Sequence, residues 1–109
     1  MGAYNEVRAQ LICPSCKANV EVDVQFKYGA VVHDRYQLGG KIRWGANDVG
    51  TPGCGAVVAD GEGTSCPNCG WDGDWPVYVM IAHDVIEAVL PATGEHDFAS
   101  AHEAFKVLR

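Results

Sequence analysis

Five cysteines are the residues of this chain whose spacing could do chemistry, and four of them fall into two matching motifs. CPSC at residues 13–16 and CPNC at residues 66–69 each place two residues between two sulfurs. Such a tight turn lets both thiolates point at one ion, and two turns supply the four thiolates of a closed tetrahedral zinc site. The sequence therefore predicts one structural zinc ion bound by Cys13, Cys16, Cys66 and Cys69.

Other chemistries are open to the same cysteines. A single CxxC can be a thioredoxin-type redox pair, but that motif begins a helix after a strand. Cys69 is followed by GWDGDWP, which is a poor start for a helix. The cysteines could also form a disulfide framework or two unrelated buried pairs, so zinc binding is one reading among these.

The cellular compartment bears on that choice. The opening MGAYNEVRAQ has no apolar run like that of an export signal, and the longest apolar stretch, residues 77–82, is too short to span a bilayer. We therefore expect a cytoplasmic protein. In a reducing compartment paired cysteines more often bind metal than form disulfides.

The motifs CPSCK and CPNCG resemble the zinc knuckles of the zinc-ribbon and rubredoxin-like superfamily. Rubredoxins hold iron between two CxxCG knuckles, whereas here Lys17 replaces the first glycine and the knuckles lie further apart, so iron is the minor alternative to zinc. Over the whole chain, MGAYNEV, QFKYG at residues 25–29 and YQLGGKI at residues 36–42 resemble small zinc-ribbon proteins of bacteria and their phages. This resemblance implies a metal and a fold class, and no activity.

The fifth cysteine, Cys54, lies in TPGCG at residues 51–55, which matches CPNCG except that threonine replaces the first cysteine. We interpret it as a degenerate third knuckle whose thiol is buried or half-buried in a tight turn. The alternatives are that Cys54 replaces one of the four ligands or is a reactive thiol. The four histidines form no metal-binding motif.

Two stretches alternate apolar and polar residues as a strand with one wet face does: residues 20–28 (VEVDVQFKY) and residues 36–44 (YQLGGKIRW). We expect two antiparallel strands joined through residues 29–35, with a bulge at Gly39 and Gly40. The aromatic rings occupy even positions, whereas Lys27, Lys41 and Arg43 occupy odd ones. The rings are therefore expected in the core and the three charges in solvent.

Further elements follow along the chain. Residues 56–60 read as a short strand, and residues 77–82 and 85–90 as a hairpin about His83 and Asp84 that is apolar on both faces. After a candidate N-cap at Asp97, apolar residues recur at the spacing of an amphipathic helix. They are Phe98, Ala101, His102, Phe105 and Leu108. The predicted fold is mainly β, an antiparallel sheet with zinc-ribbon knuckles and a short C-terminal helix, in a single domain over residues 1–109.

The charge of the chain is −6 and is unevenly distributed. Residues 24–44 carry a net +3, and residues 45–97 carry nine acids with no lysine or arginine. Four thiolates and one zinc dication add −2, for a net charge of −8. Such a field repels phosphate backbones, so general affinity for nucleic acid is not expected.

The sequence favours a non-catalytic zinc-stabilised module that acts through protein–protein contacts, as an accessory, adaptor or host–phage conflict factor. Its exposed basic residues, Lys27, Lys41 and Arg43, are the predicted contact surface, and the apolar hairpin suggests a homo-oligomer. The first alternative is a nucleic-acid-binding zinc ribbon that uses these residues and Arg35. The second is a zinc enzyme with one ligand position open to water, against which four available thiolates argue.

Overall fold

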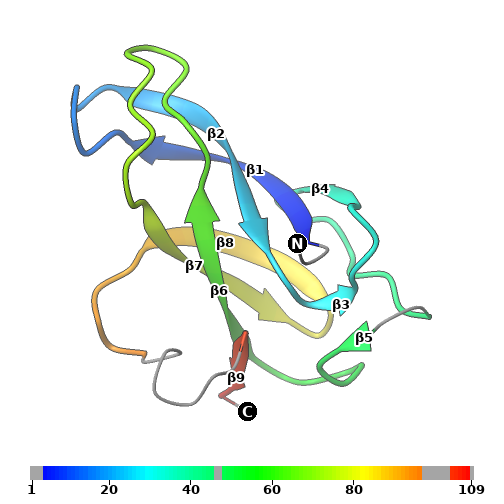
Figure 1. Ribbon diagram of the computed structural model, residues 1–109. Helices are drawn as coiled ribbons and strands as arrows, with labels where there is room; N and C mark the ends of the chain where they lie inside the picture. The colour runs from blue at the N-terminus through cyan, green and yellow to red at the C-terminus, as the bar shows by residue number, and fades with distance from the viewer. Residues whose placement is uncertain (1–3, 46–47, 97–103, 109) are drawn as a thin grey trace.

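Figure 1 shows a computed structural model of the protein, which describes residues 4–45, 48–96 and 104–108. The described residues form strands, turns and loops, and no helix. The strands are β1 (Asn5–Ile12), β2 (Asn19–Phe26), β3 (Gly29–Ala30), β4 (Arg35–Gln37), β5 (Asp48–Val49), β6 (Val57–Gly63), β7 (Pro76–Ala82), β8 (Val85–Pro91) and β9 (Phe105–Val107). The mainly β class is therefore confirmed. None of the described residues belongs to a helix long and apolar enough to cross a membrane.

Most strands belong to one curled, mixed sheet with the order β4-β1-β2-β6-β7-β8. Neighbouring strands pair in antiparallel fashion except β1 and β4, which are parallel. After β2 leaves the edge of β6, β9 takes over that edge, as the red strand at the lower end of β6 shows in Figure 1. Strands β3 and β5 form a separate small pair.

The segment after β4 closes the curl. The amide of Gly39 donates to the carbonyl of Ile86 at 2.7 Å, the amide of Ile86 donates to Gly40 at 3.0 Å, and that of Ile42 donates to Asp84 at 2.6 Å. These bonds join the segment after β4, which is the strand at one edge of the sheet, to β8 and its turn at the other edge. The sheet therefore closes on itself into a barrel-like shape, which leaves its inner face dry.

The core fills the inside of the curled sheet, as the alternation of strand side chains requires. Along β1 the odd positions are buried, and along β2 the even positions, as the sequence predicts for residues 20–28. Burial of this apolar surface is the main source of stability. The inward residues of the four long central strands include Val7, Ala9, Leu11, Val22, Val24, Phe26, Val57, Ala59, Val77, Val79 and Ile81.

The predicted strand over residues 36–44, and its antiparallel pairing with residues 20–28, are wrong. Only Arg35–Gln37 is a strand, and it pairs with β1 in parallel. The reason is the glycine pair, because Gly39 adopts a left-handed φ of 84° and the amide of Gly40 donates to Gln37 at 2.9 Å, which turns the chain toward β8. Strand β2 pairs instead with β1, in which Val7, Ala9 and Leu11 alternate with polar residues, and with β6.

The predicted C-terminal helix is not seen. Its first part, residues 97–103, lies outside the described residues, but Phe105 and its neighbours form β9, which pairs with β6 from Val57 to Ala59. The free edge that β2 leaves on β6 offers unpaired backbone groups, and pairing them outweighs a weak helical pattern.

The hairpin of β7 and β8 is present as predicted, with His83 and Asp84 at its turn. Both residues have positive φ, 49° and 66°, which matches the right-handed twist of the strands. On the outer face, the Tyr78 hydroxyl accepts hydrogen bonds from the amides of Gly94 and His96, both at 3.0 Å. The chain itself therefore covers this second apolar face at Tyr78, where the sequence had suggested another protomer.

Candidate metal centre

The two knuckles are the loops of two hairpins. The first knuckle, residues 13–16, joins β1 to β2, and the second, residues 66–69, joins β6 to β7. Strands β2 and β6 are antiparallel neighbours, and the amide of Thr64 donates to the carbonyl of Asp23 at 3.1 Å. Both hairpin ends must therefore lie at the same end of the sheet, and they are the loops at the top of Figure 1.

The four sulfurs form a compact cluster. The ligand atoms of Cys13, Cys16, Cys66 and Cys69 all lie within 4.8 Å of one another. Across the knuckles, Sγ of Cys13 lies 3.8 Å from Sγ of Cys69, and Sγ of Cys16 lies 3.8 Å from Sγ of Cys66. Sulfurs bound tetrahedrally to zinc at ~2.3 Å are separated by about 3.8 Å. The cluster could therefore hold a metal ion with little movement.

The knuckles share one backbone conformation. In the first, the amide of Lys17 donates to the carbonyl of Cys13 at 2.9 Å, and in the second the amide of Gly70 donates to Cys66 at 2.8 Å. Both donors adopt a left-handed φ, 63° for Lys17 and 77° for Gly70. Lys17 thus takes a conformation that costs a side-chain-bearing residue roughly 1–2 kcal/mol. The turn requires this conformation even though the sequence lacks the glycine.

Backbone and side-chain donors surround the sulfurs. Sγ of Cys13 accepts from the amides of Ser15 and Cys16, both at 3.4 Å. Sγ of Cys66 accepts from the amides of Asn68 and Cys69 at 3.4 and 3.5 Å. The Asn68 side-chain amide donates to Sγ of Cys16 at 3.5 Å, across the two knuckles. N–H donors of this kind favour the thiolate, which is the form that binds metal.

The thiols influence one another's ionisation. The Asn68 side chain, with the amide of Ala18, lowers the pKa of Cys16 to about 6. The Trp71 amide acts to lower the pKa of Cys69, but burial and the three other cysteines outweigh it and raise that pKa to about 11. Four negative charges at this spacing repel one another. A bound cation offsets this repulsion between thiolates, so metal binding is coupled to the release of the last thiol protons.

A metal bound by all four thiolates would have no free coordination position. A hollow of about 690 Å³ on the described surface lies away from the cluster. Its lining includes Lys27, Asp60, Glu62, Asp74 and Trp75, and none of the four clustered cysteines. The cluster is therefore not part of this hollow.

Cys54 lies apart from the cluster. Its thiol is half-buried and donates to the carbonyl of Thr51 at 3.4 Å within a tight turn. Its own carbonyl accepts the amide of His83 at 2.9 Å, and the amide of Gly53 donates to the Asp84 carboxylate at 3.0 Å. The turn that resembles a knuckle in sequence therefore supports the β7–β8 hairpin turn and contributes no sulfur to the cluster.

The predicted contact residues Lys27, Lys41 and Arg43 are all exposed, although Lys41 and Arg43 do not lie in the strand predicted for them. They do not share one environment. Lys27 borders the hollow of about 690 Å³. The backbone of Lys41 pairs with that of Val85, the first residue of β8, and Arg43 is ion-paired with Asp34. The charge of Arg43 is therefore balanced by a carboxylate within the protein.

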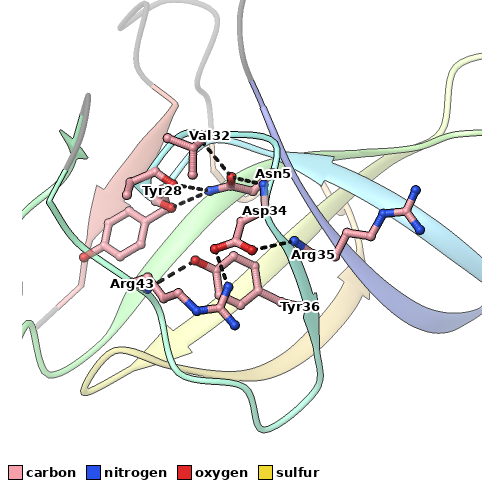
Figure 2. Close-up of polar contacts among 8 residues, drawn as sticks. Asn5, Tyr28, Val32, Asp34, Arg35, Tyr36 and Arg43 are labelled. Atoms are coloured by element: carbon pink, nitrogen blue, oxygen red, sulfur yellow. Dashed lines mark hydrogen bonds and ion pairs between the residues drawn. The ribbon is translucent and has the colours of Figure 1, made fainter.

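One structural residue was missed at the sequence level. Asn5 is fully buried at the start of β1, and its side chain makes four hydrogen bonds to the backbone of residues 28–34, which follow β2 (Figure 2). Its Nδ2 donates to the carbonyls of Tyr28 and Ala30 at 3.1 and 3.0 Å. Its Oδ1 accepts the amides of Val32 and Asp34 at 3.3 and 3.0 Å. The available signal was a polar residue at an inward position, two before Val7.

The backbone segment that Asn5 binds ends at Asp34, whose carboxylate lies next to Arg35 and Arg43. The Asp34 carboxylate accepts the amide of Arg35 at 3.0 Å and a short hydrogen bond from the Arg43 guanidinium, also drawn in Figure 2. The guanidinium lies 5.2 Å from the centroid of the Tyr36 ring. Arg43 beside Asp34 lowers the pKa of that carboxyl group. Asn5 thus determines indirectly where the charge of Arg43 is placed.

Comparisons with models of protein families, with curated proteins and with solved structures found no match.

Proposed function

We propose that this protein is a zinc-stabilised, non-catalytic module that acts by contact with a protein partner. The observation that carries the proposal is the cluster of four cysteine sulfurs between two hairpin ends, with cross-knuckle separations of 3.8 Å. A tetrahedral metal at that place links residues 13–16 to residues 66–69, which are far apart in the chain. Its role is to hold the two hairpins together.

Zinc is the metal that best fits this set of ligands. Four thiolates in a tetrahedral arrangement suit zinc or iron. Zinc has no redox chemistry, which suits a purely structural role. The half-burial of the centre also fits, because Cys13 and Cys66 are 0% and 2% exposed while Cys69 is exposed. A structural ion requires no substrate access.

A non-catalytic role follows from the closed ligand set. A catalytic zinc keeps a position for water or substrate, which four thiolates do not leave. The hollow at Asp60, Glu62 and Asp74 has no cysteine in its lining, so a substrate held there would not reach the metal.

A protein partner suits the charge better than a nucleic acid does. The net charge of −6 becomes −8 with four thiolates and zinc, and it repels phosphate. Arg43, one of the basic residues that a nucleic acid would need, is already paired with Asp34. Lys27 and Lys41 remain exposed and supply local positive charge for an acidic partner surface.

Metal content is the first test. Protein purified under reducing conditions should contain one zinc per chain by elemental analysis. Cobalt substitution should give the intense absorption of tetrahedral thiolate coordination. A chain without metal, or with iron in the same stoichiometry, contradicts the zinc assignment.

Partner binding is the second test. Tagged wild-type protein and a folded Lys27→Glu/Lys41→Glu variant should be cross-linked and recovered from the native host. We expect a specific protein that the variant loses. Gel shifts with single- and double-stranded DNA and RNA at ~150 mM salt are the counter-test, because purely electrostatic binding is weak there. Tight binding that is lost in Lys41→Glu/Arg43→Glu favours the nucleic-acid function instead.

A further inference from the structure

The four clustered sulfurs differ in their access to solvent. Cys13 and Cys66 are buried, Cys16 is half-buried and Cys69 is exposed. Small oxidants and alkylating reagents react with thiolates that they can reach. By access alone, Cys69 is the first sulfur of the cluster to meet a reagent.

The two knuckles also protect their outer cysteines unequally. Asn68 donates its side-chain amide to Sγ of Cys16 at 3.5 Å. The residue in the equivalent position of the first knuckle is Ser15, and among the described contacts its side chain makes no such bond to Cys69. A hydrogen bond to a thiolate lowers its nucleophilicity. Each outer cysteine has one backbone donor, the Ala18 amide for Cys16 and the Trp71 amide for Cys69. Cys16 has the Asn68 side chain in addition, so it is the better shielded of the two.

Two short sulfur–sulfur distances lie across the knuckles. Sγ of Cys69 is 3.8 Å from Sγ of Cys13, and Sγ of Cys16 is 3.8 Å from Sγ of Cys66. Each pair joins the β1–β2 hairpin to the β6–β7 hairpin. A disulfide in either pair would therefore tie the same two hairpin ends that a metal ion ties.

We propose that Cys69 is the oxidant-sensitive ligand of the cluster, and that a peroxide converts the metal link into a Cys13–Cys69 disulfide that preserves the join between the hairpins. This inference rests on the proposed function, in which zinc occupies the cluster. It adds a modification site and a redox response to what would otherwise be a purely structural ion.

The chemistry balances in two steps with hydrogen peroxide as oxidant. The Cys69 thiolate attacks one peroxide oxygen and the O–O bond breaks, which gives a sulfenic acid and hydroxide. The Cys13 thiolate then attacks the Cys69 sulfur, forms the S–S bond and expels a second hydroxide. Sulfur loses two electrons and peroxide gains them. Zinc, left with Cys16 and Cys66 alone, passes to solvent or a chelator, and a dithiol reverses the change.

The location of the product matters for the fold. A disulfide within one knuckle, such as Cys66–Cys69, would release zinc and leave the hairpin ends untied. The cross-knuckle disulfide releases zinc and leaves them tied. Oxidised protein should therefore keep its thermal transition close to that of the zinc form, whereas protein stripped by a chelator should not.

The experiment uses the Cys54→Ser chain, so that the fifth thiol cannot take part. Zinc content is measured first. A chain that holds no zinc refutes the proposed function, independently of how its cysteines react with peroxide. Zinc-loaded protein then receives about one equivalent of hydrogen peroxide, while zinc release is followed with a colorimetric chelator. Peptides are mapped by mass spectrometry without reduction. We expect one zinc released per chain, a Cys13–Cys69 peptide pair, and recovery with dithiothreitol and added zinc.

A second measurement does not depend on a disulfide. Zinc-loaded protein is treated with limiting N-ethylmaleimide, and Cys69 should be labelled about tenfold faster than Cys13 or Cys66. In an Asn68→Ala variant that still holds zinc, labelling of Cys16 should rise relative to Cys69. Zinc-loaded protein that yields Cys66–Cys69 or Cys13–Cys16 pairs, or labels first at Cys16, overturns the inference while leaving the zinc site intact.

Discussion

The two ends of strand β1 are tied to the rest of the protein in different ways. Beyond Ile12, the first knuckle brings two cysteine sulfurs to two others from the β6–β7 hairpin. At the opposite end, Asn5 ties residues 28–34 with four hydrogen bonds from one neutral side chain. One end has four ionisable groups that could hold a metal ion, and the other depends on a single amide.

The difference shows which of the two links can respond to conditions in solution. Four clustered thiols repel one another when ionised, so their link forms only with a cation or by oxidation. The Asn5 amide satisfies two carbonyls and two amides, carries no charge and is fully buried. In the function and the redox response proposed above, the thiol end is conditional on metal and redox state, while the asparagine end is independent of both.

The largest expected effect is loss of the metal link. Cys13→Ser, or chelation of the wild type, should unfold the protein or release the hairpin ends, because structural zinc supplies roughly 10–16 kcal/mol of apparent binding free energy in small peptides. Circular dichroism follows the thermal transition, and the fluorescence of Trp71 and Trp75, whose rings lie 5.5 Å apart beside the second knuckle, reports the local change. An unchanged transition would show that the cluster is not structural.

Hydrogen exchange separates the two ends. Chelation should raise amide exchange most in residues 12–19 and 64–75, and an Asn5 substitution should raise it most in residues 28–34. If both changes loosen the same residues equally, the two ends are not independent.

The second effect is that of Asn5→Ala. The substitution leaves the carbonyls of Tyr28 and Ala30 and two backbone amides without their partner in a buried place, so we expect a loss of ~3 kcal/mol in the free energy of unfolding. Urea unfolding of zinc-loaded protein measures it. Asn19→Ala, at an exposed position in β2, is the matched control and should change stability by no more than ~0.5 kcal/mol. Equal effects at the two positions would contradict the role of Asn5.

The third effect concerns the ion pair that the Asn5 loop positions. Arg43 lowers the pKa of Asp34 below its ordinary 3.8, so the folded state favours the ionised carboxylate. The stabilisation is therefore present above pH ~4 and is lost as pH falls through the lowered pKa. Because the Arg43 side chain is 61% exposed, Asp34→Asn should cost only ~1 kcal/mol at pH 7.

Urea unfolding at a series of pH values measures this difference, and metal loss at low pH affects both proteins alike. The gap between wild type and Asp34→Asn should narrow below pH ~4, whereas the exposed control Glu87→Gln should show little gap at pH 7. A gap that widens on acidification would mean that the sign of the linkage is wrong.

The smallest effect is that of Cys54→Ser. The half-buried thiol lies outside the cluster, and a serine hydroxyl can donate to the Thr51 carbonyl as the thiol does. Zinc should remain at one per chain, and the free energy of unfolding should change by no more than ~0.5 kcal/mol. Sub-stoichiometric zinc in this variant would identify Cys54 as a ligand.

Features that depend on neighbouring residues were predictable from the sequence. The strand over β2 followed from the alternation of valines with polar residues, and the β7–β8 hairpin from two apolar runs around His83 and Asp84. Each pair of clustered cysteines was also evident, because a CPxC turn brings its own two sulfurs together whatever the rest of the fold does. The pairing of β2 with β6 then brings the two turns to one place.

Only the tertiary structure decided which strands pair and where the buried amide lies. An alternating strand presents the same backbone groups to any neighbour, so β2 could not by itself select β1 over residues 36–44, nor could Phe105 reveal that an edge of β6 stood open to β9. Asn5 looks like any polar residue until the loop from Tyr28 to Asp34 folds over it. Local spacing determines local geometry, whereas a partner far along the chain is chosen by closure of the whole sheet.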